Sequence, residues 1–151
     1  MLRVRDLENL FGMSKRRTNK KMPLVYRGMR TPWGKADQVS FEVSFIGKVY
    51  TASHGGLKLD AKHNHKVPEY LRRKGGWYEE DCDWCIPFVI FEKEIQAEVG
   101  MDKWNKLVGD EALRTMKMWL WESYEKLFQI TLAPGESRGR DKEMKERDSV
   151  V

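Results

Sequence analysis

The sequence predicts a small α+β domain, in which an antiparallel sheet of about three strands packs against C-terminal helices. Apolar and polar residues alternate over residues 39–45, which is typical of a half-buried strand. Apolar residues then recur at three- and four-residue steps over residues 92–127, which indicates helices. The length of 151 residues suits one hydrophobic core. We therefore divide the chain into a basic N-terminal arm (1–30), one α+β domain (31–139) and a flexible charged tail (140–151).

Positive charge is concentrated in the N-terminal arm. Residues 1–30 hold nine Lys or Arg and two acidic residues, whereas the rest of the chain holds nineteen and twenty-one. Such an arm is typical of contact with nucleic acid, an acidic membrane surface or an acidic protein, and equally of a disordered, solubilising tail. An amphipathic helix is expected over residues 4–11, and a flexible basic run follows it. The residues that we expect to contact phosphate or an acidic partner are Lys15, Arg16, Arg17, Lys20 and Lys21.

A turn and a β-hairpin are expected at the start of the domain. The turn is Thr31-Pro32-Trp33-Gly34, because proline fixes one backbone angle and glycine tolerates the unusual one. In the hairpin, residues 39–45 form the first strand, residues 46–48 turn the chain and residues 49–52 return it. His54 then lies at a strand end and leads into a loop made by Gly55 and Gly56.

The rest of the domain is expected to hold one more strand and several helices. Residues 86–91 are the most apolar six in the chain and are expected to form a strand, with Pro87 at its start or edge. Pro68 is expected to begin a short helix in an otherwise polar stretch. A helix is predicted over residues 92–108, and Asp110 is expected to cap the next one.

The sequence also bears on the compartment. No apolar run approaches the roughly 18 residues that span a bilayer, and no signal peptide is recognisable. We expect a cytoplasmic protein with no membrane partner, whose two cysteines are thiols.

Two motifs are expected to meet and form a site. The first is Ser53 to Lys58, and the second runs from Gly75 to Cys85. In a binding protein, specificity would come from His54, Gly55, Gly56, Trp77, Tyr78, Glu79, Glu80 and Asp81. In a hydrolase or transferase, His54 would act as general base, Lys58 would stabilise developing negative charge, and Asp81 or another acid of residues 79–83 would orient the base. Ser53 beside His54 does not indicate a catalytic triad, because adjacent side chains on a strand point to opposite faces.

A zinc site is a further alternative, since His63, His65, Cys82 and Cys85 are the ligand types that tetrahedral zinc prefers. The histidine spacing is unusual for a zinc module, so we favour a structural role for these residues and expect no cofactor. A redox role for the cysteines is less favoured still, because the surrounding carboxylates should raise the pKa of Cys82.

Four segments of the chain resemble a bacterial and bacteriophage domain family of unknown function. They are "TPWGKADQV", "TASHGGLKL", "GGWYEEDCDW" and "PGESRGRD", and together they span about residues 31–141. The family's signatures correspond here to Ser53-His54-Gly55-Gly56 and to Gly76-Trp77-Tyr78-Glu79-Glu80-Asp81. Cys85 departs from the family pattern, in which a small apolar residue is expected. The resemblance implies a setting in phages, plasmids and other mobile elements, and it implies no activity.

We therefore expect an accessory binding protein of a phage or mobile element, with an anti-defence or regulatory role, that acts on a host or mobile-element protein or on nucleic acid. The alternatives are a small hydrolase or transferase that uses His54 with the acidic residues 79–83, and a structural zinc module. The sequence does not indicate an oligomeric state.

Overall fold

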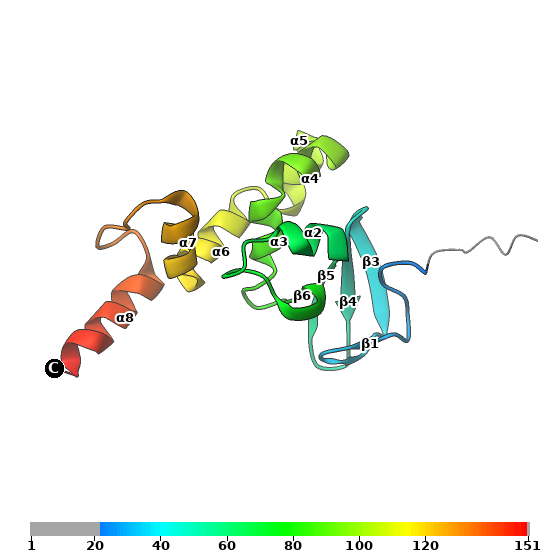
Figure 1. Cartoon of the computed structure of the whole chain (residues 1–151), viewed down its shortest axis with the longest axis horizontal. Coiled ribbons are helices and arrows are strands. Elements are labelled where there is room, and N and C mark those ends of the chain that lie inside the picture. The colour runs from blue at the N-terminus through cyan, green and yellow to red at the C-terminus, as the bar shows by residue number, and fades with distance from the viewer. Residues whose placement is uncertain (1–21, 151) are drawn as a thin grey trace, which may run out of the picture.

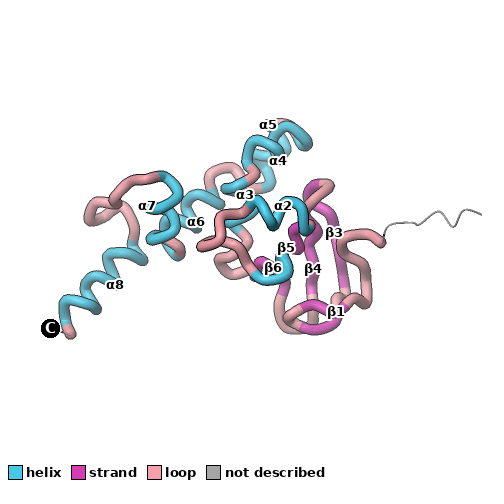
Figure 2. Tube along the Cα trace, viewed as in Figure 1, coloured by secondary structure: helices cyan, strands magenta, loops and turns pink. Residues whose placement is uncertain are grey.

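The protein has an α+β fold, with two antiparallel sheets at one end and most of the helices at the other (Figures 1 and 2). The computed structural model describes residues 22–150. The helix expected over residues 4–11 and the basic run from Lys15 to Lys21 lie outside the described residues. None of the helices within residues 22–150 is long and apolar enough to cross a membrane.

A small hairpin precedes the main sheet. Its strands are β1 (Arg30–Thr31) and β2 (Gly34–Lys35), which pair antiparallel. The predicted turn is confirmed between them. Thr31 Oγ1 accepts a hydrogen bond from the Trp33 N–H at 3.1 Å and donates one to the Gly34 carbonyl at 2.7 Å. Trp33 is thereby held at the tip of the hairpin.

The main sheet has four strands in the order β3-β4-β5-β6, and all neighbours are antiparallel. The predicted hairpin is present as β3 (Gln38–Val43) and β4 (Ile46–Tyr50). Its turn lies at Ser44 and Phe45, however, and not at residues 46–48. The turn is earlier because Phe45 and Ile46 are both buried, and because Glu98 of a helix accepts hydrogen bonds from the Ser44 N–H and hydroxyl.

Two segments have a different secondary structure from the one that the sequence predicted. The glycines expected in a loop belong to strand β5 (Gly55–Leu59), and the fourth strand is β6 (Trp77–Glu79). The apolar residues 86–91 were predicted as a strand, but residues 86–90 belong to helix α3 (Cys85–Ile90) and Phe91 follows its end. Pro87 is compatible with the first turn of a helix, where its missing N–H has no partner to lose. An apolar run this short does not distinguish a strand from a buried helix.

The helical segments are shorter than the sequence pattern indicated. Gly100, with φ of +84°, divides the predicted helix of residues 92–108 into two. No helix begins at Pro68, where residues 68–72 form turns. A helix forms instead over residues 61–66, in the polar stretch that precedes Pro68. Asp110 precedes the next helix as expected, but its side chain makes no capping hydrogen bond. The helices are α2 (Ala61–Lys66), α4 (Glu92–Val99), α5 (Met101–Leu107), α6 (Glu111–Trp119), α7 (Trp121–Phe128) and α8 (Arg138–Ser149), with a 3-10 turn η1 (Lys74–Gly76).

Each face of the sheet has its own apolar cluster. One face packs on the helices, with Leu59, Tyr78, Ile86, Ile95 and Met116 completely buried between the two layers. The opposite face is covered by residues 22–36. There Val25, Ala36 and Val49 are buried, and Trp33 and Trp77 pack against them. The first cluster forms the main core, and the second fixes the N-terminal segment on the sheet.

The C-terminal residues form helix α8, in contrast to the flexible tail predicted from residue 140. Ser137 caps this helix by accepting from the Arg140 N–H, and its hydroxyl donates to the Lys117 carbonyl at 2.7 Å. The Trp121 indole N–H donates to Glu143 at 2.9 Å. The sequence contains few apolar residues here, so the pattern gave no sign of a docked helix. Polar contacts and one close backbone approach hold it instead.

The close approach involves Gly139, and substitution by alanine tests it. A Cβ at this position would overlap the Met118 carbonyl oxygen of α6. We expect Gly139→Ala to lower the free energy of unfolding by about 1–3 kcal/mol, in the range of other overpacking substitutions, and to speed amide exchange in α8. Denaturant unfolding and hydrogen exchange measure the two effects. Lys142→Ala in the same helix, where the side chain is 80% exposed, is the control. Unchanged stability and exchange in Gly139→Ala would contradict this account of the docking.

Candidate functional site

The structure brings the two sequence motifs together as neighbouring strands. Strand β5 pairs with β6 so that Gly56 is opposite Glu79 and Lys58 is opposite Trp77. The Glu80 N–H also donates to the Gly55 carbonyl at 3.1 Å. The expected meeting of the motifs is therefore observed. Their residues do not enclose one pocket, however, but contribute to two hollows on opposite faces of the sheet.

The glycines of these motifs have structural roles. A Cβ on Gly56 would overlap Trp33 Cη2, and one on Gly55 would lie 2.8 Å from Glu80 Oε2 and 3.1 Å from the Val49 carbonyl oxygen. Gly76 has φ of +75°, and a Cβ there would lie 2.5 Å from the Leu59 carbonyl oxygen. Gly55 and Gly56 are buried in the sheet. Packing thus accounts for residues that were predicted to contact a partner.

Tyr78 also has a structural role, because it is completely buried. Its hydroxyl donates to Asn64 Oδ1 at 2.6 Å and accepts from the Arg73 N–H at 3.4 Å. Burial raises the pKa of Tyr78, so the side chain is a neutral phenol at physiological pH. The hydrogen bonds join β6 to helix α2 and to the loop that leads into η1.

His54 and Lys58, the proposed base and electrostatic partner, have different surroundings. His54 closes the turn before β5, where its carbonyl accepts from the Thr51 N–H at 2.8 Å. Its side chain is 54% exposed, with Nδ1 4.0 Å from Glu80 Oε1. Lys58 instead lies on the face that residues 22–36 cover, where Nζ donates to the Gly75 carbonyl and lies 4.7 Å from the Trp77 ring centroid. Burial lowers the pKa of Lys58.

The acidic residues of the second motif divide in the same way. Glu80 lines the hollow on the helix-covered face, and Glu79 lines the hollow on the opposite face. Asp81, proposed as an orienting acid, is exposed in the turn after β6. Burial and the neighbouring Asp81 carboxylate raise the pKa of Glu79.

The zinc candidates each have other contacts. The His63 ring stacks on Phe45 with centroids 3.9 Å apart, and its nitrogens lie 2.8 Å from Asp60 and 3.0 Å from Glu94. Burial raises the pKa of Cys85 to about 12, and burial with the Asp83 charge raises that of Cys82. Both cysteines are free thiols, and His65 is exposed on α2. Within residues 22–150, no three His, Cys, Asp or Glu side chains are grouped so that they could hold a metal ion.

The hollow on the helix-covered face has a volume of about 390 Å³. It is mixed in character, since two carboxylates and one ammonium group lie among aromatic rings. The Lys48 ammonium lies 5.1 Å from the Tyr50 ring centroid. The residues that give the hollow this character are Glu42, Lys48, Tyr50, Glu80, Trp84 and Phe88.

The hollow on the opposite face, which we call the tryptophan hollow, has a volume of about 720 Å³. The rings of Trp33 and Trp77 meet edge to face in it, with centroids 5.7 Å apart and planes at 87°. Trp33 was predicted to lie in a turn and was not among the predicted site residues. The sequence feature that could have identified Trp33 as a site residue is a tryptophan in a predicted turn with a lysine two residues later. The hollow is lined by Pro32, Trp33, Arg73, Lys74, Gly75, Trp77, Glu79 and Asp83.

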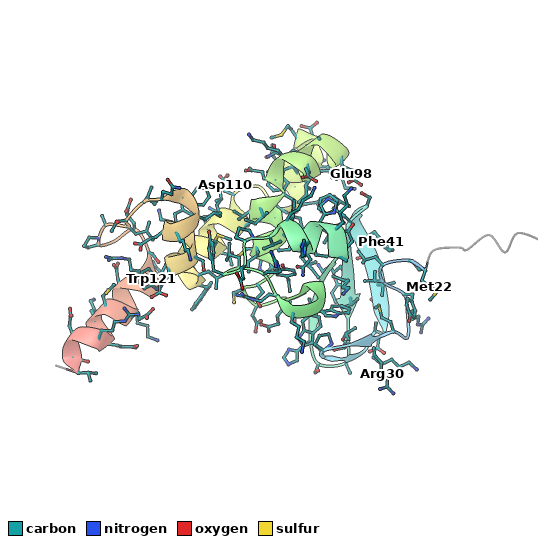
Figure 3. The ribbon with its side chains drawn as sticks, viewed as in Figure 1. Met22, Arg30, Phe41, Glu98, Asp110 and Trp121 are labelled. Carbon is teal, nitrogen blue, oxygen red and sulfur yellow. The ribbon has the colours of Figure 1, made fainter. Side chains whose placement is uncertain are left out.

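Four cations without carboxylate partners in the described chain lie beside the tryptophan hollow or on the hairpin that carries Trp33. Arg30 and Lys35 are directly opposite each other in the β1–β2 hairpin, and Arg30 extends away from the body (Figure 3). Neither of them, nor Lys58 or Lys74, forms an ion pair with another residue of the described chain. We call these four residues the basic cluster. Arg73 differs, since Asp83 holds it at 2.8 Å, and this bond raises its pKa.

Several cations of the C-terminal helices, in contrast, form ion pairs. Arg147 contacts Glu122 at 3.2 Å and also pairs with Glu143, and Lys142 lies 3.9 Å from Glu146. Arg140 lies 3.7 Å from Glu125. Three of the five cations of α8 are therefore paired with carboxylates, whereas the four cations of the basic cluster, like most Lys and Arg of residues 22–150, are not.

The chain belongs to a family described as a domain of unknown function (DUF7007), whose model matches residues 26–150. The match includes the hairpin, both sheets and the C-terminal helices, and so covers nearly all of the described chain. Neither a curated protein nor a solved structure was found to match.

Cysteine reactivity tests the geometry around α3. The thiolate is the reactive form, and a raised pKa keeps both thiols protonated at neutral pH. We expect iodoacetamide at pH 8 to label Cys85 only after unfolding, and to label Cys82 more slowly in the native protein than in the denatured one. Mass spectrometry of the labelled peptides measures both rates, and the two cysteines serve as controls for each other. Rapid labelling of Cys85 in the native state would contradict its burial.

Proposed function

We propose that this protein is a non-enzymatic nucleic-acid-binding protein that acts as an accessory factor of a phage or other mobile element, in an anti-defence or regulatory role. The observation that supports this most directly is the basic cluster beside partly exposed aromatic rings. Two like charges opposite each other in a hairpin destabilise it unless an anion lies nearby. Nucleic acid supplies such anions at regular spacing.

The N-terminal arm extends this positive charge. Residues 9–36 contain eight Lys or Arg and no acidic residue. Their described part, residues 22–36, covers the sheet face that carries the tryptophan hollow. The arm is therefore joined directly to the segment that forms this surface. Asp37 and Glu79 also lie on this side of the sheet, so positive charge predominates there without being uniform.

A host or mobile-element protein with an acidic surface is the alternative partner, because the same cations would attract it. Nucleic acid is favoured by the combination of unpaired cations with aromatic rings, which is the usual composition of surfaces that bind both phosphate and base. The setting in phages and mobile elements rests on the sequence resemblance alone.

The hydrolase and transferase alternative has less support. A general base works on a nucleophile or substrate within hydrogen-bond reach. The nearest carboxylate to His54 is Glu80 at 4.0 Å, and Lys58 is bonded to Gly75 on the other face. The zinc alternative has no grouped ligands among residues 22–150.

Neutralising the arm tests the electrostatic part of the proposal. Each phosphate contact contributes about 0.7–0.9 to the slope of log affinity against log salt. We expect replacement of Lys15, Arg16, Arg17, Lys20 and Lys21 by Ala to remove five phosphate contacts, to reduce that slope by about 4 and to weaken binding at low salt. Fluorescence anisotropy with a labelled oligonucleotide measures the slope. The matched control replaces five exposed lysines on the helices by Ala, namely Lys93, Lys103, Lys106, Lys142 and Lys145. Salt-independent binding, or equal loss in the control, would count against the proposal.

Incubation with nucleic acid separates binding from catalysis. We expect labelled single- and double-stranded DNA and RNA to remain intact after prolonged incubation with the protein and Mg²⁺, because the His54 side chain is half exposed and its carboxylate neighbour Glu80 is 4.0 Å away, beyond hydrogen-bond reach. Denaturing gels detect any cleavage. If the protein cleaves nucleic acid, and His54→Ala abolishes cleavage while binding persists, the protein is a hydrolase that uses His54 and not a non-enzymatic binding protein.

A further inference from the structure

We propose that the tryptophan hollow binds an unpaired base, and that the protein therefore prefers single-stranded nucleic acid. This inference rests on the proposed function and specifies its ligand. It starts from the edge-to-face arrangement of Trp33 and Trp77, whose rings are only partly buried. Two aromatic planes at 87° form a corner in which a flat ring can stack on one indole while its edge contacts the other.

The corner is held in place from both sides. Trp33 packs on Gly56 and is fixed by the turn at the tip of the β1–β2 hairpin, whereas Trp77 belongs to β6 and pairs with Lys58 across the sheet. Gly75 has φ of +66° and brings its backbone against the Trp77 ring. Preorganised rings lose little conformational freedom when a ligand stacks on them.

The charges around the hollow suit a base inside it and phosphates outside it. Glu79 and Asp83 line the hollow, so an anionic phosphate would be repelled there, while their oxygens can accept hydrogen bonds from base amino groups. The cations Lys58 and Lys74 lie beside the hollow, and Arg30 and Lys35 lie on the hairpin that forms one wall. A nucleotide with its base in the hollow would place an adjacent phosphate toward Lys74, an exposed residue of its lining, and the rest of the strand toward the hairpin.

A duplex does not fit this arrangement, because its base faces are already stacked on each other. Single strands expose base faces, and stacking on aromatic side chains is their common mode of recognition. An aromatic corner of this kind could also hold a proline-rich peptide. The four residues of the basic cluster have no role in binding a neutral peptide, so they favour the nucleic acid.

The test compares probes that have equal charge but differ in their bases. The full-length protein is titrated with a single-stranded oligonucleotide of about twelve nucleotides, its abasic counterpart with the same phosphates, and the corresponding duplex. We expect the single strand to bind about tenfold more tightly than the abasic strand at the same salt concentration, and more tightly than the duplex.

Variants of Trp77 then assign the preference to the hollow. We expect Trp77→Leu to remove the tenfold preference for bases and to leave the salt slope unchanged, and Trp77→Phe to keep most of the preference. Trp119→Leu is the matched control, since Trp119 is 64% exposed and lies on α6. Thermal unfolding checks that each variant is folded. If Trp77→Leu does not fold, the abasic comparison and Trp77→Phe still decide.

The outcomes are distinguishable. Equal binding of the normal and abasic strands would overturn this inference and leave the proposed function standing. Failure of every probe to bind would overturn the proposed function as well. A proline-rich peptide that binds, loses affinity in Trp77→Leu and competes with no oligonucleotide would assign the hollow to a protein partner and overturn the inference.

Discussion

The packing of Trp33 on Gly56 is the contact on which the sheet face opposite the helices depends. Any side chain larger than hydrogen at position 56 would overlap the indole. Because this contact is possible, Trp33 at the tip of the β1–β2 hairpin packs on strand β5, and Val25 fits over Gly47 in the same layer. Glycine is a poor strand former, so packing and not local propensity explains its presence in β5. The tryptophan hollow exists only because the hairpin is held there.

The glycine-containing motifs of this chain therefore determine its architecture more than its chemistry. Gly55, Gly56 and Gly76 permit close approach, and Tyr78 joins β6 to α2 through Asn64. In the last motif, Ser137 caps α8 and Gly139 lets it meet α6. Exposed side chains outside these contacts, such as those of His54, Arg30, Lys35 and Lys74, are the ones available to a partner.

The sequence predicted the fold class, the first hairpin of the main sheet and the meeting of the two motifs. It failed where tertiary contacts outweigh local pattern. Residues 86–91 are apolar throughout, so the sequence pattern does not distinguish a strand from the buried helix α3 to which residues 86–90 belong. Helix α8 has almost nothing apolar to bury, and its docking depends on Ser137, Gly139 and Trp121, whose partners are distant in sequence. Trp33 was missed because its importance arises from contact with Gly56 and Trp77.

The positions of individual charges indicate more about the function of this protein than its net charge does. The chain has enough carboxylates to neutralise most of its cations, and on α8 it does so within single helical turns and across to α7. In the hairpin that carries Trp33, the same neutralisation would have required only one acidic residue opposite Arg30 or Lys35. Two cations stand there instead, at a cost to the hairpin. A surface that keeps repulsive charges beside partly exposed indoles is stabilised when an anionic, aromatic ligand binds, and single-stranded nucleic acid combines both properties.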